Sequence, residues 1–231
     1  MSKTLDLAKP DRTIHAGVIL LNAETEIMDV APIDFLYGLS HSVVDGMPDE
    51  VCPPNFKAQA IDLQIHWVSE KGKATNSQLT SRISLTPTDS FETCPPLDIV
   101  LMGAEAPGYV ANEAELAFVR KSWEDCSAFL TICGGMTTPL KAGILEGKTA
   151  TAPRFWLPVL RQQAPGTDWV EKRWARDGKL WSSGALLNGL DLMKAFVTEF
   201  WGGEGTLAEF LARMCAWPIR DVDYKDVSWN I

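Results

Sequence analysis

The chain has 231 residues, a length that fits one globular domain and is long enough to bury a full hydrophobic core. Hydrophobic residues make up 46% of the sequence and charged residues 22%, a composition that excludes a disordered, collagen-like or membrane-embedded protein. The 21 Lys and Arg residues are outnumbered by 30 Asp and Glu residues, and the resulting formal net charge of -9 argues against nucleic acid or an anionic membrane as a partner.

Targeting signals and cysteine usage point to the cytoplasm. No apolar run approaches the roughly 18 residues of a transmembrane helix. Lys9, Asp11 and Arg12 interrupt the stretch in which a signal peptide would need its apolar core. The cysteines are widely spaced without a CxxC pair, which fits neither a disulfide framework nor a zinc site, so we expect reduced thiols. They are Cys52, Cys94, Cys126, Cys133 and Cys215.

In chain order, residues 1–13 are polar and are expected to form a flexible segment ahead of a single domain over residues 14–231. The mostly apolar residues 14–21 predict a strand buried on both faces. Residues 29–40 predict a helix, with Pro32 tolerated in its first turn. Further strands or hairpins are predicted at residues 60–69, 79–85, 97–102, 128–132, 149–152, 168–174 and 180–183. Further helices are predicted at residues 112–125, 136–142, 185–201 and 206–215.

Strands that alternate with helices predict an α/β fold with a mainly parallel sheet and helices on both faces, because parallel strands need crossover connections. In such folds, ligands bind at the carboxyl ends of the strands. The loops in which to search for a site are therefore those around Asp29, residues 103–109, Cys133 and Pro153.

The sharpest chemical signal is Cys133, which lies between a predicted buried strand and a helix and is followed by Gly134 and Gly135. A strand that turns sharply into a helix crowds the backbone, so small residues are needed, and the side chain at the turn projects above the sheet. The helix N-terminus is expected to lower the pKa of the thiol. The pattern alone leaves an inert core cysteine equally open.

Four segments between about residues 14 and 200 resemble the ThiJ/PfpI superfamily, and within it the isonitrile hydratase branch. They read AGVILLNAETEIMDVAPIDFLYGLS, CPPLDIVLMGAE, AFLTICGGMTTPLKAGILEGKTATAP and RDGKLWSSGALLNGLDLMKAF. The resemblance implies a flavodoxin-like three-layer sandwich, a homodimer and a nucleophile at Cys133. It further implies that the active-site carboxylate of the hydratase branch is Asp29.

A carboxyl beside a thiolate can donate a hydrogen bond or relay a proton, and burial next to a negative sulfur would raise its pKa enough for that role. Without the resemblance, Asp29 is better interpreted as a helix N-cap, and the two roles are compatible. Gly134 is expected to supply a backbone N–H to a developing anion. The loop of Gly103, Ala104 and Glu105 is expected to face it across the site.

Several positions depart from the hydratase pattern. The residue after the cysteine is usually Thr in the hydratases but is Gly134 here, and many superfamily members carry His where this chain has Pro153. All three histidines precede residue 67, so a base after the nucleophile, as in amidotransferases, is absent. Glu105 is an extra carboxylate that could replace the missing acid or base, the alternative being an ordinary solvated glutamate.

An apolar, aromatic substrate pocket is expected near the predicted strand ends, and Arg154 could bind a polar group of the substrate. A packing role explains the aromatic residues equally well. The expected pocket residues are Gly103, Ala104, Tyr109, Met136, Arg154, Phe155 and Trp156.

Together these features predict a cysteine-dependent hydratase that acts on a small, largely apolar electrophile such as an isonitrile. No metal or organic cofactor is implied, because the sequence has neither a metal-spaced ligand cluster nor a phosphate-binding glycine fingerprint. Two alternatives stay open. One is a redox-responsive protein that uses oxidation of Cys133, and the other is an enzyme with glyoxalase-like or deglycase-like chemistry.

Overall fold

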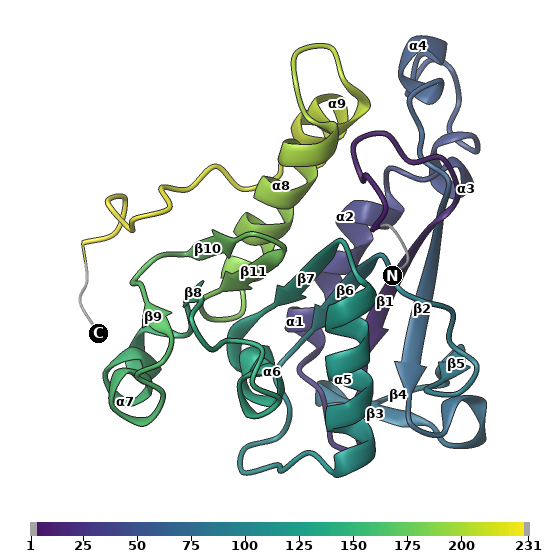
Figure 1. Ribbon diagram of the computed structural model, residues 1–231. Helices are drawn as coiled ribbons and strands as arrows, with labels where there is room; N and C mark the ends of the chain where they lie inside the picture. The colour runs from purple at the N-terminus through teal and green to yellow at the C-terminus, as the bar shows by residue number, and fades with distance from the viewer. Residues whose placement is uncertain (1–3, 229–231) are drawn as a thin grey trace.

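The computed structural model describes residues 4–228 and has a central sheet between two layers of helices (Figure 1). The sheet has the strand order β10-β11-β7-β6-β1-β2-β5, and every neighbouring pair is parallel except β10 and β11. The expected flavodoxin-like α/β fold is therefore confirmed. The strands are β1 (Ile14–Ile19), β2 (Leu63–Ser69), β5 (Asp89–Ser90), β6 (Ile99–Met102), β7 (Ala128–Thr131), β10 (Trp174–Asp177) and β11 (Leu180–Ser183).

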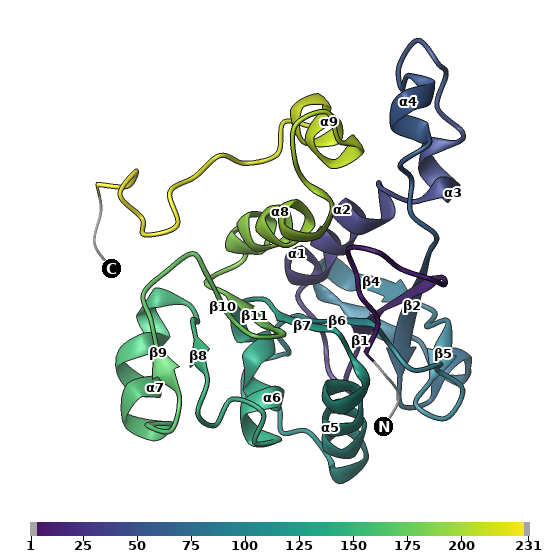
Figure 2. The ribbon, with the colours of Figure 1, turned by 45° about the horizontal axis from the view of Figure 1, so that its top comes forward.

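The central strands are buried on both faces. Every residue of β6 and β7 is buried, which explains why their sequences are continuous apolar runs instead of alternating patterns. Helices provide this cover from both sides (Figure 2). On one face lie α1, α2, α8 and α9, and on the other lie α5, α6 and α7. Their bounds are α1 (Ile27–Val30), α2 (Asp34–Tyr37), α5 (Glu113–Asp125), α6 (Thr137–Lys141), α7 (Leu157–Gln163), α8 (Asn188–Trp201) and α9 (Leu207–Met214).

The helix predicted at residues 29–40 is divided in the structure. It begins earlier, as α1, and the N-cap is Glu26, whose carboxylate accepts a hydrogen bond from the backbone N–H of Met28. A 3-10 turn, η1 (Ala31–Ile33), then separates α1 from α2 at Pro32. The N-cap interpretation of Asp29 is therefore wrong, because Asp29 lies inside the first turn of α1 and is buried.

Shorter elements complete the fold. Residues 79–85 were expected to form a strand or hairpin, and β3 and β4 form an antiparallel hairpin there. Two one-turn helices, α3 and α4, were not predicted, because one turn is too short to show helical periodicity. These elements are α3 (His41–Val44), α4 (Pro54–Lys57), β3 (Ser77–Leu79), β4 (Ile83–Leu85), β8 (Thr149–Ala150), β9 (Asp168–Trp169), η2 (Gly72–Ala74), η3 (Thr80–Arg82), η4 (Cys133–Met136) and η5 (Arg154–Trp156).

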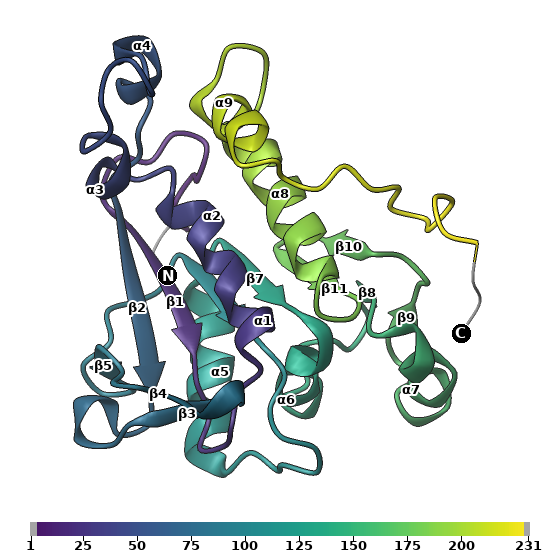
Figure 3. The same ribbon diagram turned by 180° about the vertical axis from the view of Figure 1, so that it is seen from behind.

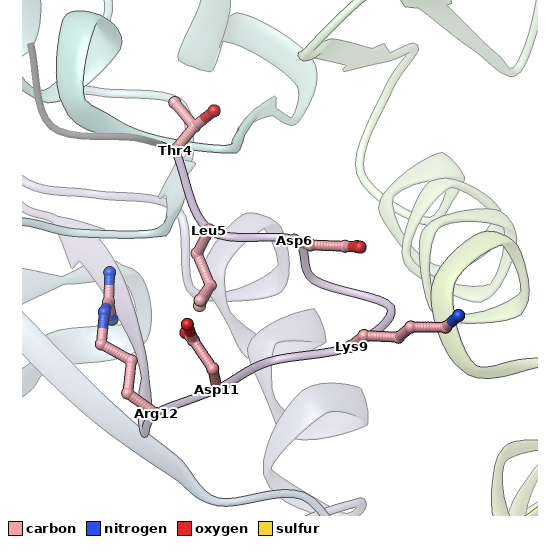
Figure 4. A pocket seen from close by; sticks show the side chains of 6 residues that line it. All are labelled: Thr4, Leu5, Asp6, Lys9, Asp11 and Arg12. Carbon is pink, nitrogen blue, oxygen red and sulfur yellow. The ribbon is translucent and has the colours of Figure 1, made fainter.

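The N-terminal segment lies against the domain. Leu7 is buried, and the Arg12 guanidinium donates two hydrogen bonds of 2.7 Å to the Asp98 carboxylate at the amino end of β6. Of the segment expected to be flexible, residues 1–3 lie outside the described residues. Six of the described residues of this segment line a surface pocket (Figure 4): Thr4, Leu5, Asp6, Lys9, Asp11 and Arg12. This pocket is at the amino ends of the parallel strands, whereas the expected site is at their carboxyl ends.

Within residues 4–228, no helix is both long enough and apolar enough to span a lipid bilayer.

Candidate active site

The loops that follow β1, β6, β7 and β11 meet at the carboxyl edge of the sheet. Cys133 directly follows the loop residue after β7 and begins η4. Its backbone N–H donates to the Gly184 carbonyl after β11 at 3.0 Å, and the Ile132 N–H donates to the Met102 carbonyl of β6 at 3.0 Å. These two bonds fix the turn from both neighbouring strands. Cys133 has φ +56°, a strained conformation for a residue with a side chain.

The glycines after Cys133 are required by close approaches. A Cβ atom at Gly135 would lie 2.3 Å from the Met102 carbonyl oxygen, a distance that backbone atoms cannot relieve. A Cβ at Gly134 would lie 3.0 Å from the Ala104 Cβ and 3.4 Å from the indole ring of Trp156. The strand therefore turns into a helix as expected for a nucleophile elbow. Because Gly134 has no side chain, it also leaves room for the Trp156 ring beside it.

Asp29 is fully buried in α1 and belongs to this edge of the sheet. Its Oδ2 atom accepts the backbone N–H of Ala104 at 2.9 Å, and the Ala104 carbonyl in turn accepts the Glu26 N–H at 2.8 Å. A Cβ at Gly103 would lie 2.8 Å from the Asp29 Cβ, so the loop after β6 can approach Asp29 this closely only with glycine at position 103. Asp29 Oδ1 is buried without a hydrogen-bond partner of ordinary geometry, and the Cys133 thiol faces this carboxyl.

The environment favours the neutral form of the carboxyl. Burial raises the pKa of Asp29 to about 7, and the charge of Glu26 adds to the increase. The Ala104 N–H and the Cys133 thiol oppose it by stabilising the carboxylate. Asp29 is therefore poised to hold or release a proton near neutral pH.

The expectation that the helix N-terminus lowers the pKa of Cys133 is wrong. Burial raises the pKa of this thiol, and the negative charge of Asp29 raises it further. The backbone N–H groups of Leu186 and Gly134 act in the opposite direction but do not outweigh burial. The element that follows Cys133 is a single 3-10 turn, so its N–H groups offer little compensation. When Asp29 is protonated its repulsion of the sulfur disappears, so the two groups titrate as a pair.

Glu105 lies in the loop after β6, but its carboxylate accepts a hydrogen bond from the Thr138 hydroxyl of α6 at 3.3 Å. Burial raises the pKa of Glu105 to about 7, so it is not an ordinary solvated glutamate. The groups that influence its pKa are Thr138, Glu115 and Lys141, and neither Asp29 nor Cys133 is among them. The structure therefore places Glu105 toward α6 and not beside the thiol.

The expected pocket residues Met136, Tyr109, Arg154, Phe155 and Trp156 do not all lie together. The Trp156 ring borders Gly134. The ring of Phe155 packs edge to face on that of Trp156, with 5.5 Å between the ring centroids. Met136 is buried in the core between the sheet and α5. The Tyr109 hydroxyl donates to the Glu115 carboxylate at 2.7 Å, away from the thiol. Arg154 forms a 2.7 Å ion pair with Glu171 and lies over the ring of Tyr224.

Sequence reasoning missed two contributors to the site. Leu186, in the turn after β11, directs its backbone N–H at the Cys133 thiol, and it does so with φ +31°. Glu26 caps α1 and acts electrostatically on both Asp29 and Cys133. Glutamate is not among the residues that favour the N-cap position, and nothing in the sequence marks a backbone N–H as a thiol partner.

The histidines do not reach this site. His15 and His66 are hydrogen-bonded to one another at 2.9 Å, and His66 also bonds Asp89 at 2.9 Å, across β1, β2 and β5. His41 forms a pair with Asp45 on α3. Among residues 4–228, no group of three or more His, Cys, Asp or Glu side chains is arranged to hold a metal ion.

Comparisons with known proteins agree on the family and the fold. The sequence model of the DJ-1/PfpI family matches residues 45–199. Isonitrile hydratase from Pseudomonas putida is 30% identical over 155 residues, which cover 65% of this chain and 65% of that protein. A ThiJ/PfpI family protein from Pseudomonas syringae has the same fold, with a TM-score of 0.70 and 20% identity over 91% of this chain and 77% of that one. Drosophila melanogaster DJ-1beta superposes with a TM-score of 0.68 and 16% identity, over 90% of this chain and 100% of that one.

Proposed function

The chain belongs to the DJ-1/PfpI family, and we propose that it is a cysteine-dependent hydratase that converts isonitriles into N-substituted formamides. The observation that supports this reaction best is the buried Asp29 carboxyl, whose pKa is raised to about 7, facing the thiol of Cys133. The sequence similarity to isonitrile hydratase supports the same substrate class. Because the matched region covers only 65% of that relative, its activity comes to this chain as a proposal.

In the first step, the Cys133 sulfur bonds to the terminal carbon of the isonitrile, and that carbon takes a proton from the Asp29 carboxyl. The product is a thioimidate, in which the sulfur is joined to a CH=N–R group. Thiolate and carboxylic acid are thus consumed together, and Asp29 is left as a carboxylate. A carboxyl with a pKa near 7 can donate this proton at neutral pH.

In the second step, the Asp29 carboxylate removes a proton from water while the oxygen attacks the thioimidate carbon, and Asp29 passes this proton to the nitrogen. The hydroxyl proton then returns to Asp29 as the carbon–sulfur bond breaks, which releases the formamide and regenerates the Cys133 thiolate. One water is consumed for each isonitrile, and Asp29 regains the proton it gave. The Gly134 N–H supports the Cys133 sulfur, because its hydrogen bond lowers the pKa of the thiol.

The surroundings suit an apolar substrate better than a charged one. Trp156 is 39% exposed beside Gly134, and Leu186 is 40% exposed in the turn whose N–H faces the sulfur. The two alternatives have less support. A redox-responsive protein would use the same Cys133 thiolate but has no need for the buried Asp29 carboxyl that faces it. Glyoxalase-like chemistry lacks a histidine here, because His15 and His66 bond to each other and to Asp89.

The test is turnover of an aliphatic and an aromatic isonitrile, with the formamide detected by mass spectrometry. Cys133→Ala should abolish turnover, and Asp29→Asn should lower kcat by about 10²- to 10⁴-fold because the proton donor is lost. Cys215→Ser, at an exposed cysteine on the far end of α9, is the control and should keep full activity.

No turnover of either isonitrile by folded protein with reduced Cys133 would contradict the proposal. If mild peroxide then adds oxygen selectively at Cys133, the redox alternative becomes the better interpretation. If the protein consumes methylglyoxal instead, the glyoxalase-like alternative becomes the better interpretation. The homodimer implied by the family resemblance is a separate proposal, which the molar mass in solution tests.

A further inference from the structure

The C-terminal segment, residues 217–228, returns from α9 across β10 toward the loop that precedes that strand (Figures 1 and 3). It lies beyond residue 199, where the family match ends. The Arg173 N–H donates to the Val222 carbonyl at 2.8 Å, and the buried Arg173 guanidinium donates to Asp226 at 2.6 Å. Lys172 pairs with Asp223 at 2.7 Å. This segment, the C-terminal strap, is therefore fastened to the loop before β10.

Tyr224 is the residue of the strap that reaches inward. Its ring lies between two guanidinium groups, at 4.9 Å from that of Arg154 and 4.7 Å from that of Arg173. Its hydroxyl donates to the side-chain oxygen of Asn188, the first residue of α8, at 2.9 Å. A Cβ atom at Gly184 would lie 2.8 Å from the same hydroxyl oxygen. Tyr224 therefore contacts the turn that joins β11 to α8 at both of its ends.

The β11–α8 turn also contacts Cys133, which lies in η4 after β7. The Gly184 carbonyl accepts the Cys133 N–H at 3.0 Å, and the Gly184 N–H donates to the Arg173 carbonyl at 2.9 Å. Leu186, two residues further on, directs its N–H at the Cys133 sulfur. A continuous path of contacts thus runs from the strap through Tyr224 and the β11–α8 turn to the backbone and sulfur of Cys133.

Backbone strain coincides with this path. Cys133, Leu186 and Tyr224 have φ values of +56°, +31° and +59°, and none of them is glycine. A non-glycine residue in this region costs free energy and persists where surrounding contacts enforce it. Cys133 carries the sulfur, Leu186 directs its N–H at it, and Tyr224 contacts the turn that contains Leu186.

We propose that Tyr224 is a positioning residue for the reaction. Through its hydroxyl bond to Asn188 and its contact with Gly184, it holds the β11–α8 turn. That turn fixes the Cys133 backbone through the Gly184 carbonyl and keeps the Leu186 N–H close to the Cys133 sulfur. This inference rests on the proposed function in one respect, since it takes Cys133 as the nucleophile. The strap thereby becomes a part of the active site that the matched family region does not include.

Tyr224→Phe tests the proposal, because it removes the hydroxyl and keeps the ring between the two guanidinium groups. Iodoacetamide labelling of Cys133 is followed against pH by peptide mass mapping. Loss of the directed N–H makes the thiolate less stable, so the midpoint of labelling should move to higher pH, with labelling about three- to tenfold slower at pH 7. Tyr37→Phe, on an exposed face of α2, is the matched control and should leave the profile unchanged.

Amide hydrogen exchange of the peptide covering residues 184–189 gives a second measurement. Exchange there should be faster in Tyr224→Phe than in the unaltered protein, and unchanged in Tyr37→Phe. An identical labelling profile and identical exchange in folded Tyr224→Phe would overturn the positioning role. Neither measurement uses a substrate. Absence of isonitrile turnover would therefore count against the proposed function and leave the test of Tyr224 intact.

Discussion

At the scale of single residues, the central feature is a proton that Asp29 and Cys133 can share. Burial disfavours the charged form of both groups, and a negative charge on either one disfavours ionisation of the other. The pair therefore holds one negative charge more readily than two. Asp29 takes that charge first, because its pKa is about 7 whereas the pKa of the Cys133 thiol is raised. Transfer of the thiol proton to Asp29 then gives the thiolate and the proton donor that addition to an isonitrile needs.

Asp29→Asn should lower activity and raise stability at alkaline pH. Between its ordinary pKa of 3.8 and the raised value of about 7, Asp29 keeps a proton in the folded protein that it loses in the unfolded chain. Ionisation therefore opposes folding increasingly as the pH rises through this window, by up to about 4 kcal/mol above pH 7. Asparagine removes this penalty and can still accept the Ala104 N–H.

The measurement is urea unfolding of both proteins at pH 5 and pH 8. The gain in the free energy of unfolding for Asp29→Asn should be larger at pH 8. An equal difference at both pH values would mean that the carboxyl is ionised throughout. Asp34→Asn, at the start of α2, serves as the control for a general effect of charge on the domain.

Gly135→Ala should destabilise the fold by about 1–3 kcal/mol or more, since its Cβ would lie 2.3 Å from the Met102 carbonyl oxygen. The backbone of β6 or of η4 must shift to relieve the clash, and Cys133 moves with it. Gly46→Ala is the control, because its Cβ would make an ordinary contact of 3.6 Å. Thermal unfolding compares the two, and similar melting temperatures would show that the elbow adapts easily.

How far these residues could be predicted depends on what positions them. The glycines after Cys133 predict the turn, because a strand that turns sharply into a helix crowds its own backbone. The pKa of the thiol is not a local property. It depends on burial and on Asp29, which the fold brings from a distant segment, so the sequence suggested the wrong direction for it. The direction of the Glu105 side chain toward Thr138 is likewise set by tertiary contacts.

At the scale of elements, continuous apolar runs predicted β1, β6 and β7 well, since strands buried on both faces need no alternation. The NEAE sequence at residues 112–115 marks the start of α5, and the structure shows a capping box there. One-turn helices such as α3 carry no periodicity and were missed. The β11–α8 turn was not recognised as part of the site, because its contribution is a backbone N–H.

The capping glutamate of α5 leads to a prediction about the loops beside the site. Glu115 is fully buried and accepts backbone N–H groups from Asn22 and Asn112 at 2.7 Å, as well as the Tyr109 hydroxyl. Glu115→Ala would leave these donors unsatisfied and should cost about 2–4 kcal/mol of the free energy of unfolding. Glu113→Ala, at an exposed position on the same turn, should cost little. Urea unfolding distinguishes them, and equal effects would contradict this role.

At the scale of the whole molecule, the ends of the chain serve opposite edges of the sheet. The C-terminal strap reaches the carboxyl edge, where Cys133 lies. The N-terminal segment closes the amino edge, where Arg12 binds Asp98 and the Ser127 hydroxyl donates to the Leu5 carbonyl at 2.6 Å. Both terminal segments thus contact the ends of strands, although residues 1–13 were expected to be flexible.

Leu7→Ala tests whether the N-terminal segment belongs to the cooperative unit of folding. Leu7 is 2% exposed and contacts the core that α2 and α8 share with the sheet, so its truncation should lower the free energy of unfolding by about 2–5 kcal/mol. Val110→Ala, at a side chain 69% exposed, is the control and should change it by less than about 0.5 kcal/mol. If residues 1–13 were a flexible extension of a domain that begins at Ile14, Leu7→Ala would behave like the control. If Leu7→Ala lowers the free energy of unfolding but leaves its slope against urea concentration unchanged, the folding unit begins before β1.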